Sequence, residues 1–253
     1  GYGTAQYLIV LRNAVFNYDP DLVVVGFCLN DLTDNLRFRY MSIENGRLVI
    51  APPRVLSPAG KIKAAAKSFL AQRSHLWILV SVRLERLIRR VKGPLPSIVN
   101  LPPPGEYGIP PERMSLYFQN FAKEYGREMQ EAWDLALAIL REMKGECRAR
   151  GIPMVLCLIP NEQQLDPDVW REVIVHYAAD PDAYDTLKPN RVLADFCEEE
   201  GIHFLDLYPS FKEAADRGEV LYYPVARHWN PRGHEVAARA LADFLLVRVL
   251  PRE

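Results

Sequence analysis

The chain contains the stretch DLVVVGFC at residues 21–28, and this stretch decides its fold class. It is a short run of mostly β-branched residues, which is typical of a strand buried on both faces of a sheet. Two similar apolar runs follow at residues 153–160 and 203–207. Because amphipathic helical patterns alternate with these runs, the sequence predicts an α/β fold with a parallel sheet. The helical patterns lie at residues 4–17, 112–149, 187–200 and 231–248.

The composition is that of an ordinary globular protein. The chain has 253 residues, of which 49% are hydrophobic and 25% charged, and one α/β domain with an insertion fits this length. A net charge of −1 excludes the strongly basic balance of a general nucleic-acid binder. No apolar run reaches the about 18 residues of a membrane helix. The cysteines form no C-x-x-C pair, which favours free thiols over a disulfide or a zinc site. They are Cys28, Cys147, Cys157 and Cys197.

An insertion interrupts the alternation of strands and helices at residues 36–111. Its residues 58–92 carry nine Lys or Arg against one Glu, a net charge of nine minus one, or +8. Residues 161–220 have fifteen acidic and five basic residues, a net charge of −10. Either the two segments are solvated faces that contact each other, or the basic segment contacts an anionic lipid or polymer surface. We expect a helical, basic cap at residues 36–111 of a single domain spanning residues 1–253.

Polar residues follow the predicted strands at the carboxyl ends, where parallel α/β sheets bind ligands. Asn30 comes directly after the first strand, and residues 160–164 follow the second. The third strand leads through a helix to a segment that contains His228. Asn30 is either a turn residue that bonds its own backbone or an amide donor aimed at a developing oxyanion.

His228 lies just outside the last predicted helix. Asn230 and Pro231 predict the start of that helix, because Asn is a good N-cap and Pro suits the first helical position. His228 is therefore either a packed or capping histidine or a general base. His234 falls inside the helix, and we expect it to be structural.

Three motifs resemble those of the SGNH (GDSL) hydrolase family. They are Gly1-Tyr2-Gly3-Thr4-Ala5-Gln6, Cys28-Leu29-Asn30-Asp31 and His228-Trp229-Asn230-Pro231-Arg232-Gly233-His234. The resemblance implies that Gly1 lends a backbone N–H and Asn30 a side-chain amide to the oxyanion hole, and that His228 is the general base. The His-Trp-Asn run is also similar to alginate-type O-acetyltransferases.

The resemblance covers residues 1–35 and 112–250, outside the basic insertion. It implies a flavodoxin-like sheet with helices on both faces. It also implies hydrolysis of an acyl or acetyl ester, on a small molecule or a carbohydrate, through a serine acyl-enzyme. No cofactor, metal or nucleic acid is implied.

The chain departs from the family in two important ways. It contains no Gly-Asp-Ser motif and no Gly-x-Ser-x-Gly elbow to supply the nucleophile. Val225 and Ala226 occupy the positions of the acid that precedes the family's histidine. A milder departure is Cys28, where the family has a glycine two residues before Asn30. We therefore expect the nucleophile, and enough residues for two strands, upstream of Gly1.

Our interpretation is the larger, C-terminal part of an SGNH-type ester hydrolase whose cellular compartment is open. Two alternatives remain beside it. One is a non-catalytic SGNH-like module that binds a carbohydrate or a lipid. The other is a polysaccharide O-acetyltransferase, which would use the same serine and histidine.

Overall fold

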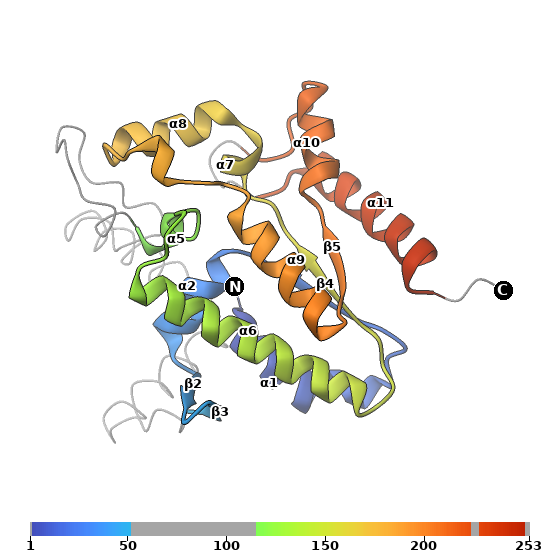
Figure 1. Cartoon of the computed structure of the whole chain (residues 1–253). Coiled ribbons are helices and arrows are strands. Elements are labelled where there is room, and N and C mark those ends of the chain that lie inside the picture. The colour runs from blue at the N-terminus through green and yellow to red at the C-terminus, as the bar shows by residue number, and fades with distance from the viewer. Residues whose placement is uncertain (1, 52–114, 224–227, 251–253) are drawn as a thin grey trace, which may run out of the picture. The chain divides into compact units, whose positions relative to one another are not determined.

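The computed structural model describes residues 2–51, 115–223 and 228–250 (Figure 1). By their contacts, Gly1–Ala51 and Pro103–Glu253 form one compact unit, and Pro52–Pro102 form a second. The second unit lies outside the described residues. So does nearly all of the predicted cap, including its basic segment, and both stay predictions.

The sheet of the first unit has three parallel strands in the order β1-β4-β5. Val25 pairs with Leu156, and Cys157 pairs with Leu205. The predicted α/β fold with a parallel sheet is confirmed, and all three predicted strands form. Their bounds are β1 Val23–Phe27, β4 Met154–Leu158 and β5 His203–Asp206.

The two outer strands differ from the central one. Every residue of β4 is buried, as expected for a strand between two others. β1 pairs with β4 on one side, and Val24 in β1 is 40% exposed. The prediction that residues 21–28 are buried on both faces was therefore wrong, because the apolar cluster on the face of Val24 includes Cys157 of β4 and Leu205 of β5 but no residue of β1.

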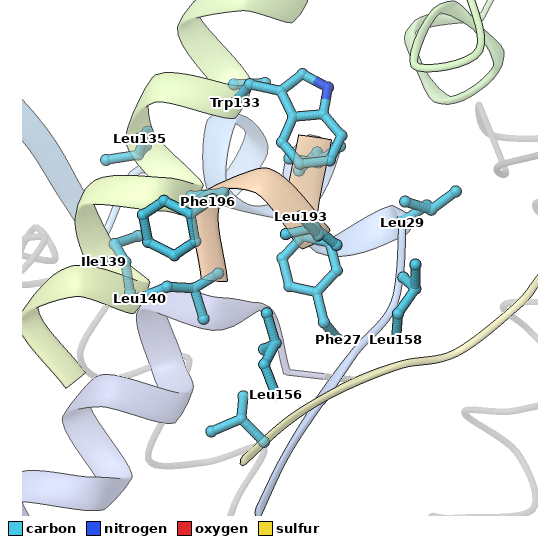
Figure 2. Close-up of a cluster of buried hydrophobic side chains, with 14 of the residues drawn as sticks. Phe27, Leu29, Trp133, Leu135, Ile139, Leu140, Leu156, Leu158, Leu193 and Phe196 are labelled. Atoms are coloured by element: carbon cyan, nitrogen blue, oxygen red, sulfur yellow. The ribbon is translucent and has the colours of Figure 1, made fainter. Parts of the chain in front are cut away.

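Helices cover both faces of the sheet. On one face α1 and α6 lie side by side (Figure 1), and with α9 they bury Phe27 of β1 and Leu156 of β4. Figure 2 shows the side chains of this core, in which Trp133 and Ile139 of α6 face the strands. On the other face α10 and α11 pack on Cys157 and Leu205. The bounds are α1 Thr4–Asn13, α6 Arg127–Arg148, α9 Lys188–Glu200, α10 Tyr208–Asp216 and α11 Pro231–Arg248.

The predicted helices match these elements with two exceptions. The helix expected at residues 4–17 ends at Asn13, and a 3-10 helix, η1 Val15–Tyr18, follows it. The helix expected at residues 112–149 is divided, because α5 Leu116–Gln119 ends before a loop and α6 begins after Gly126. The loop packs into the core through Phe121. Tertiary packing thus overrides the helical periodicity of this segment.

Several short elements complete the unit. β2 and β3 form an antiparallel hairpin whose turn, Asn45-Gly46, has positive φ at both residues, as a type I′ turn requires. Residues 161–187 form the helices α7 and α8 and the 3-10 helix η3. The bounds are η1 Val15–Tyr18, α2 Asn30–Phe38, β2 Met41–Glu44, β3 Arg47–Ile50, α7 Glu162–Leu165, α8 Pro167–His176 and η3 Pro181–Ala183. Within the described ranges, none of the helices combines the length and the apolar character needed to cross a membrane.

Candidate functional site

Asn30 begins α2 directly after β1, at the carboxyl end of the strand. Its side chain is half-buried, and its Nδ2 donates a hydrogen bond to Oδ2 of Asp34 at 3.1 Å. Thr33 donates from Oγ1 to the Asn30 carbonyl at 2.9 Å. The Asn30 amide is thus held by Asp34, one turn further along α2. It lies at the carboxyl end of the sheet, where α/β folds bind ligands.

The start of α1 lies against α2. The backbone N–H of Ala5 donates to Oδ1 of Asn35 at 3.1 Å, and the Asn35 amide donates to the Thr4 hydroxyl. A Cβ atom on Gly3 would lie 3.2 Å from the same Asn35 oxygen. A side chain at this position would therefore require Asn35 to shift by a few tenths of an ångström. Gly1, the second predicted oxyanion donor, lies outside the described residues.

Asp31 is a buried carboxyl group that the sequence reasoning did not single out. It is 0% exposed, and its Oδ2 accepts a hydrogen bond from the Cys28 backbone N–H at 3.3 Å. Among the described residues no donor reaches its Oδ1. Burial raises the pKa of Asp31 to about 8, with a further rise from Asp34 and a partial offset from the Cys28 N–H. Asp31 is therefore mostly protonated at neutral pH.

The Cys28 thiol is the nucleophilic side chain nearest to Asn30 in sequence. Burial, then Asp31 and Cys157, raises its pKa to about 12. A thiol with that pKa is protonated at neutral pH, and the thiolate is the nucleophilic form.

His228 lies on a strand-like arm that pairs with the segment before it. The Tyr223 N–H donates to the His228 carbonyl at 2.8 Å, and the Asn230 N–H donates to the Leu221 carbonyl at 2.9 Å. Tyr222 and Trp229 form a bridge between these two bonds. The His228 side chain is exposed. Val225 and Ala226 lie outside the described residues.

Tyr222 ties this arm to the sheet. Its hydroxyl is buried and donates to the carbonyl of Pro160, two residues after β4, at 2.6 Å. Burial is the main cause that raises the pKa of Tyr222. A hydrogen bond with Trp229 partly offsets this rise, and nearby groups, first Glu162, add to it. The His228 arm is thus attached at the same edge of the sheet that carries Asn30.

Comparison with models of known protein families finds a match over the C-terminal half of the chain. The family described as SGNH hydrolase-like domain, acetyltransferase AlgX, matches residues 116–251. The chain belongs to this family. The match covers more than half of the chain and includes His228, while β1 and Asn30 precede it.

A curated relative of this SGNH hydrolase-like domain is a probable alginate O-acetylase AlgJ of Pseudomonas aeruginosa. It is 30% identical over 118 residues, which are 46% of this chain and 27% of the relative. The chain thus spans about a quarter of that relative's length. A solved structure of a Lactobacillus plantarum protein is 19% identical, covering 45% of this chain and 54% of its own. Its TM-score of 0.32 is too low to support a conclusion.

The last helix of the SGNH hydrolase-like domain starts as predicted. Oδ1 of Asn230 accepts from the N–H groups of Arg232 and Gly233 at 2.9 and 3.0 Å, and Pro231 is the first helical residue. Gly233 allows the helix to approach the His228 arm, because a Cβ there would lie 2.5 Å from the Leu221 carbonyl oxygen. His234 is exposed and packs edge-on against Trp229.

The loop after β4 joins a chain of buried amides. Gln164 donates to Oδ1 of Asn190 at 2.8 Å, and Asn190 donates to Asp206 at the end of β5, also at 2.8 Å. At the start of α7 the Asn161 backbone N–H donates to Oε1 of Gln164 at 2.9 Å. This loop therefore braces the ends of β4 and β5, and its spacing in the sequence carried no signal of that role.

Two grooves lie on the described surface of the domain. One, of about 300 Å³, follows the open side of β1 and is apolar, with Tyr7 and Val10 of α1, Met143 of α6, and Val24 among its lining residues. The other, of about 440 Å³, lies between α7 and α10 and reaches Tyr222. It carries four carboxylates and one lysine, from Glu162, Asp166, Asp216, Glu219 and Lys212. Within the described ranges no cluster of side chains is suited to hold a metal ion.

Proposed function

We propose that this SGNH hydrolase-like domain performs acyl-ester chemistry through a serine supplied by a segment outside residues 1–253. Asn30 and the Gly1 N–H would hold the oxyanion, and His228 would be the general base. The observation that carries this proposal is the bond between Tyr222 and Pro160, because it attaches the His228 arm at the edge where Asn30 follows β1.

The proposed reaction has two steps. The serine oxygen attacks the ester carbonyl while His228 accepts the serine proton, and the resulting oxyanion receives hydrogen bonds from Asn30 and Gly1. The intermediate then releases the alcohol, which takes its proton from His228, and an acyl-serine remains. In the second step His228 accepts the proton of an incoming hydroxyl, whose oxygen attacks the acyl carbonyl. The serine oxygen then leaves and takes that proton from His228, which restores both residues.

We favour a carbohydrate hydroxyl over water as the incoming group. The family description names an acetyltransferase, and the curated relative is a probable alginate O-acetylase. The exposure of His228 supports this choice, because a bulky polymer can approach a base only if it lies on the surface. The reaction would then be acetyl transfer to a polysaccharide, with ester hydrolysis as the side reaction.

The apolar groove beside β1 supports a place for the serine-bearing segment. Among the described residues β1 pairs only with β4, so its other side presents unpaired backbone groups next to apolar side chains. Such an edge favours the addition of another strand. A strand parallel to β1 in this groove would end at the same edge of the sheet as Asn30.

A binding module remains the second candidate function, because Ala226 and Val225 carry no carboxylate to orient His228. A main-chain carbonyl could accept the Nδ1–H of His228, but it carries no full negative charge to stabilise the imidazolium.

Product analysis separates these functions. The protein that carries residues 1–253 and the serine-bearing segment is incubated with an aryl acetate, with and without a deacetylated polyuronate. We expect acetyl esters on the polymer, and their loss in His228→Ala but not in His234→Ala. Free acetate as the sole product would make the domain a hydrolase. Polymer binding without turnover would make it a binding module.

A further inference from the structure

The Asn30 side-chain amide is held by a carboxylate, that of Asp34. Its Nδ2 donates to Oδ2 of Asp34 at 3.1 Å, and both side chains are half-buried. A carboxylate only accepts hydrogen bonds, so the NH₂ end of the amide must face Asp34, and the amide oxygen must face away. Because the two N–H bonds of a planar amide diverge by about 120°, the direction of the second one is then fixed.

Asp34 also lies against the start of α1. A Cβ atom on Gly3 would be 3.3 Å from the Asp34 Cβ. The Asp34 Cβ therefore lies close to the backbone of Gly3. The next residue, Asn35, holds the same turn of α1 through Ala5. The segment that carries Asp34 is thus attached to the start of α1 by the residue that follows it.

We infer that Asp34 is a positioning residue for the Asn30 amide, an inference that rests on the proposed function. It makes no bond to the substrate. It excludes the flipped amide, whose oxygen would repel an oxyanion, and it directs the second N–H of Asn30.

The first test compares Asp34→Ala with Asp34→Asn in the protein that includes the serine-bearing segment. With an aryl acetate, Asp34→Ala should lower kcat about tenfold and leave KM within about twofold, because misplacing a donor penalises the transition state. Asp34→Asn should lie closer to wild type, because its amide oxygen can accept the same bond. Unchanged kcat in Asp34→Ala would overturn the inference.

A double variant separates positioning from a structural effect. In an Asn30→Ala background, Asp34→Ala should cause no further fall in kcat, because the amide it positions is gone. An equal fall in both backgrounds would overturn the inference. Asp134→Ala is the matched control, because Asp134 accepts from Gln130 at 2.9 Å with the same four-residue spacing on α6. That exposed pair should not affect kcat.

Side-chain NMR distinguishes failure of this inference from failure of the proposed function. The ¹H–¹⁵N signals of the Asn30 amide, identified by their loss in Asn30→Ala, should shift in Asp34→Ala and stay in place in Asp134→Ala. Unshifted signals would refute the contact itself. If the signals shift in Asp34→Ala but the wild-type protein shows no turnover, the contact exists and the proposed function is refuted. The positioning role would then be refuted as well.

Discussion

Oδ1 of Asn35 accepts a hydrogen bond from the Ala5 backbone N–H at 3.1 Å. The two residues lie thirty positions apart in the sequence, and their bond joins the first turn of α1 to α2. Asn35 is buried, and it satisfies a free N–H at the start of a helix, where four such groups lack a partner within the helix. One side chain thus holds the start of α1 to α2, the helix that Asn30 begins.

Loss of that side chain should destabilise the domain. Asn35→Ala leaves the Ala5 N–H buried without an acceptor, and we expect the free energy of unfolding to fall by about 1–3 kcal/mol. Urea denaturation measures this change. Asn13→Ala is the control, because the Asn13 amide bonds the Ile9 carbonyl at an exposed position, and it should change stability by less than about 0.5 kcal/mol. Equal losses of stability in the two variants would contradict the prediction that the buried bond of Asn35 contributes more than the exposed bond of Asn13.

Asp31 should make the stability of the domain depend on pH. Burial raises its pKa from 3.8 to about 8, so the folded state prefers the neutral acid. Below pH 4 the Asp31 carboxyl is neutral in both the folded and the unfolded state, so its ionisation does not affect stability. As the pH rises from about 4 to 8, ionisation favours the unfolded state, and the free energy of unfolding falls. Each unit of pKa shift corresponds to about 1.4 kcal/mol. Asp31→Asn should therefore be more stable than wild type at pH 8.5 and similar at pH 4 by urea denaturation. A matching gain from Asp134→Asn, at an exposed site, would contradict this assignment.

Removal of the Asn30 amide should reduce turnover. If Asn30 donates to the oxyanion, Asn30→Ala lowers kcat for a short aryl ester by about 10²–10³. KM should change much less, because the charge develops only in the transition state. Steady-state kinetics of the protein with its serine-bearing segment measure both. Unchanged activity in a folded variant would leave Asn30 as a residue that only begins α2.

A carboxylate before His228 should accelerate the reaction. Ala226→Asp restores the acid that the family resemblance places two residues before the histidine, and loss of such an acid costs about 10⁴ in kcat in serine proteases. We expect a clear rise in kcat at nearly constant KM, which His228→Ala should abolish. A folded Ala226→Asp protein with no gain, and no loss on removing His228, would favour the binding module.

The groove beside β1 should bind apolar molecules when residues 1–253 are produced alone. We expect enhanced fluorescence of an apolar dye, and we expect Val24→Lys to reduce it, because Val24 lines the groove. Val247→Lys, at an exposed position of α11, is the matched control. If both variants bind the dye equally, the groove is not the dye site and the case for an added strand loses its support.

The sequence by itself determined the features that depend on neighbouring residues. The three strands follow from short β-branched or apolar runs, and α11 begins at Pro231 because Asn230 caps it within three residues. These patterns involve residues close together in the sequence, so they can be recognised without knowledge of the fold. The family resemblance came from the same kind of short motif, and the match over residues 116–251 confirmed it.

The tertiary structure alone decided which groups meet and which are buried. Asp31 reads as an ordinary polar residue after a strand, yet packing buries it and raises its pKa. The bond from Tyr222 to Pro160 spans sixty-two positions, and the exposure of Val24 depends on which side chains pack over its face of the sheet. Burial and pairing are set by segments distant in the sequence, so no local pattern encodes them.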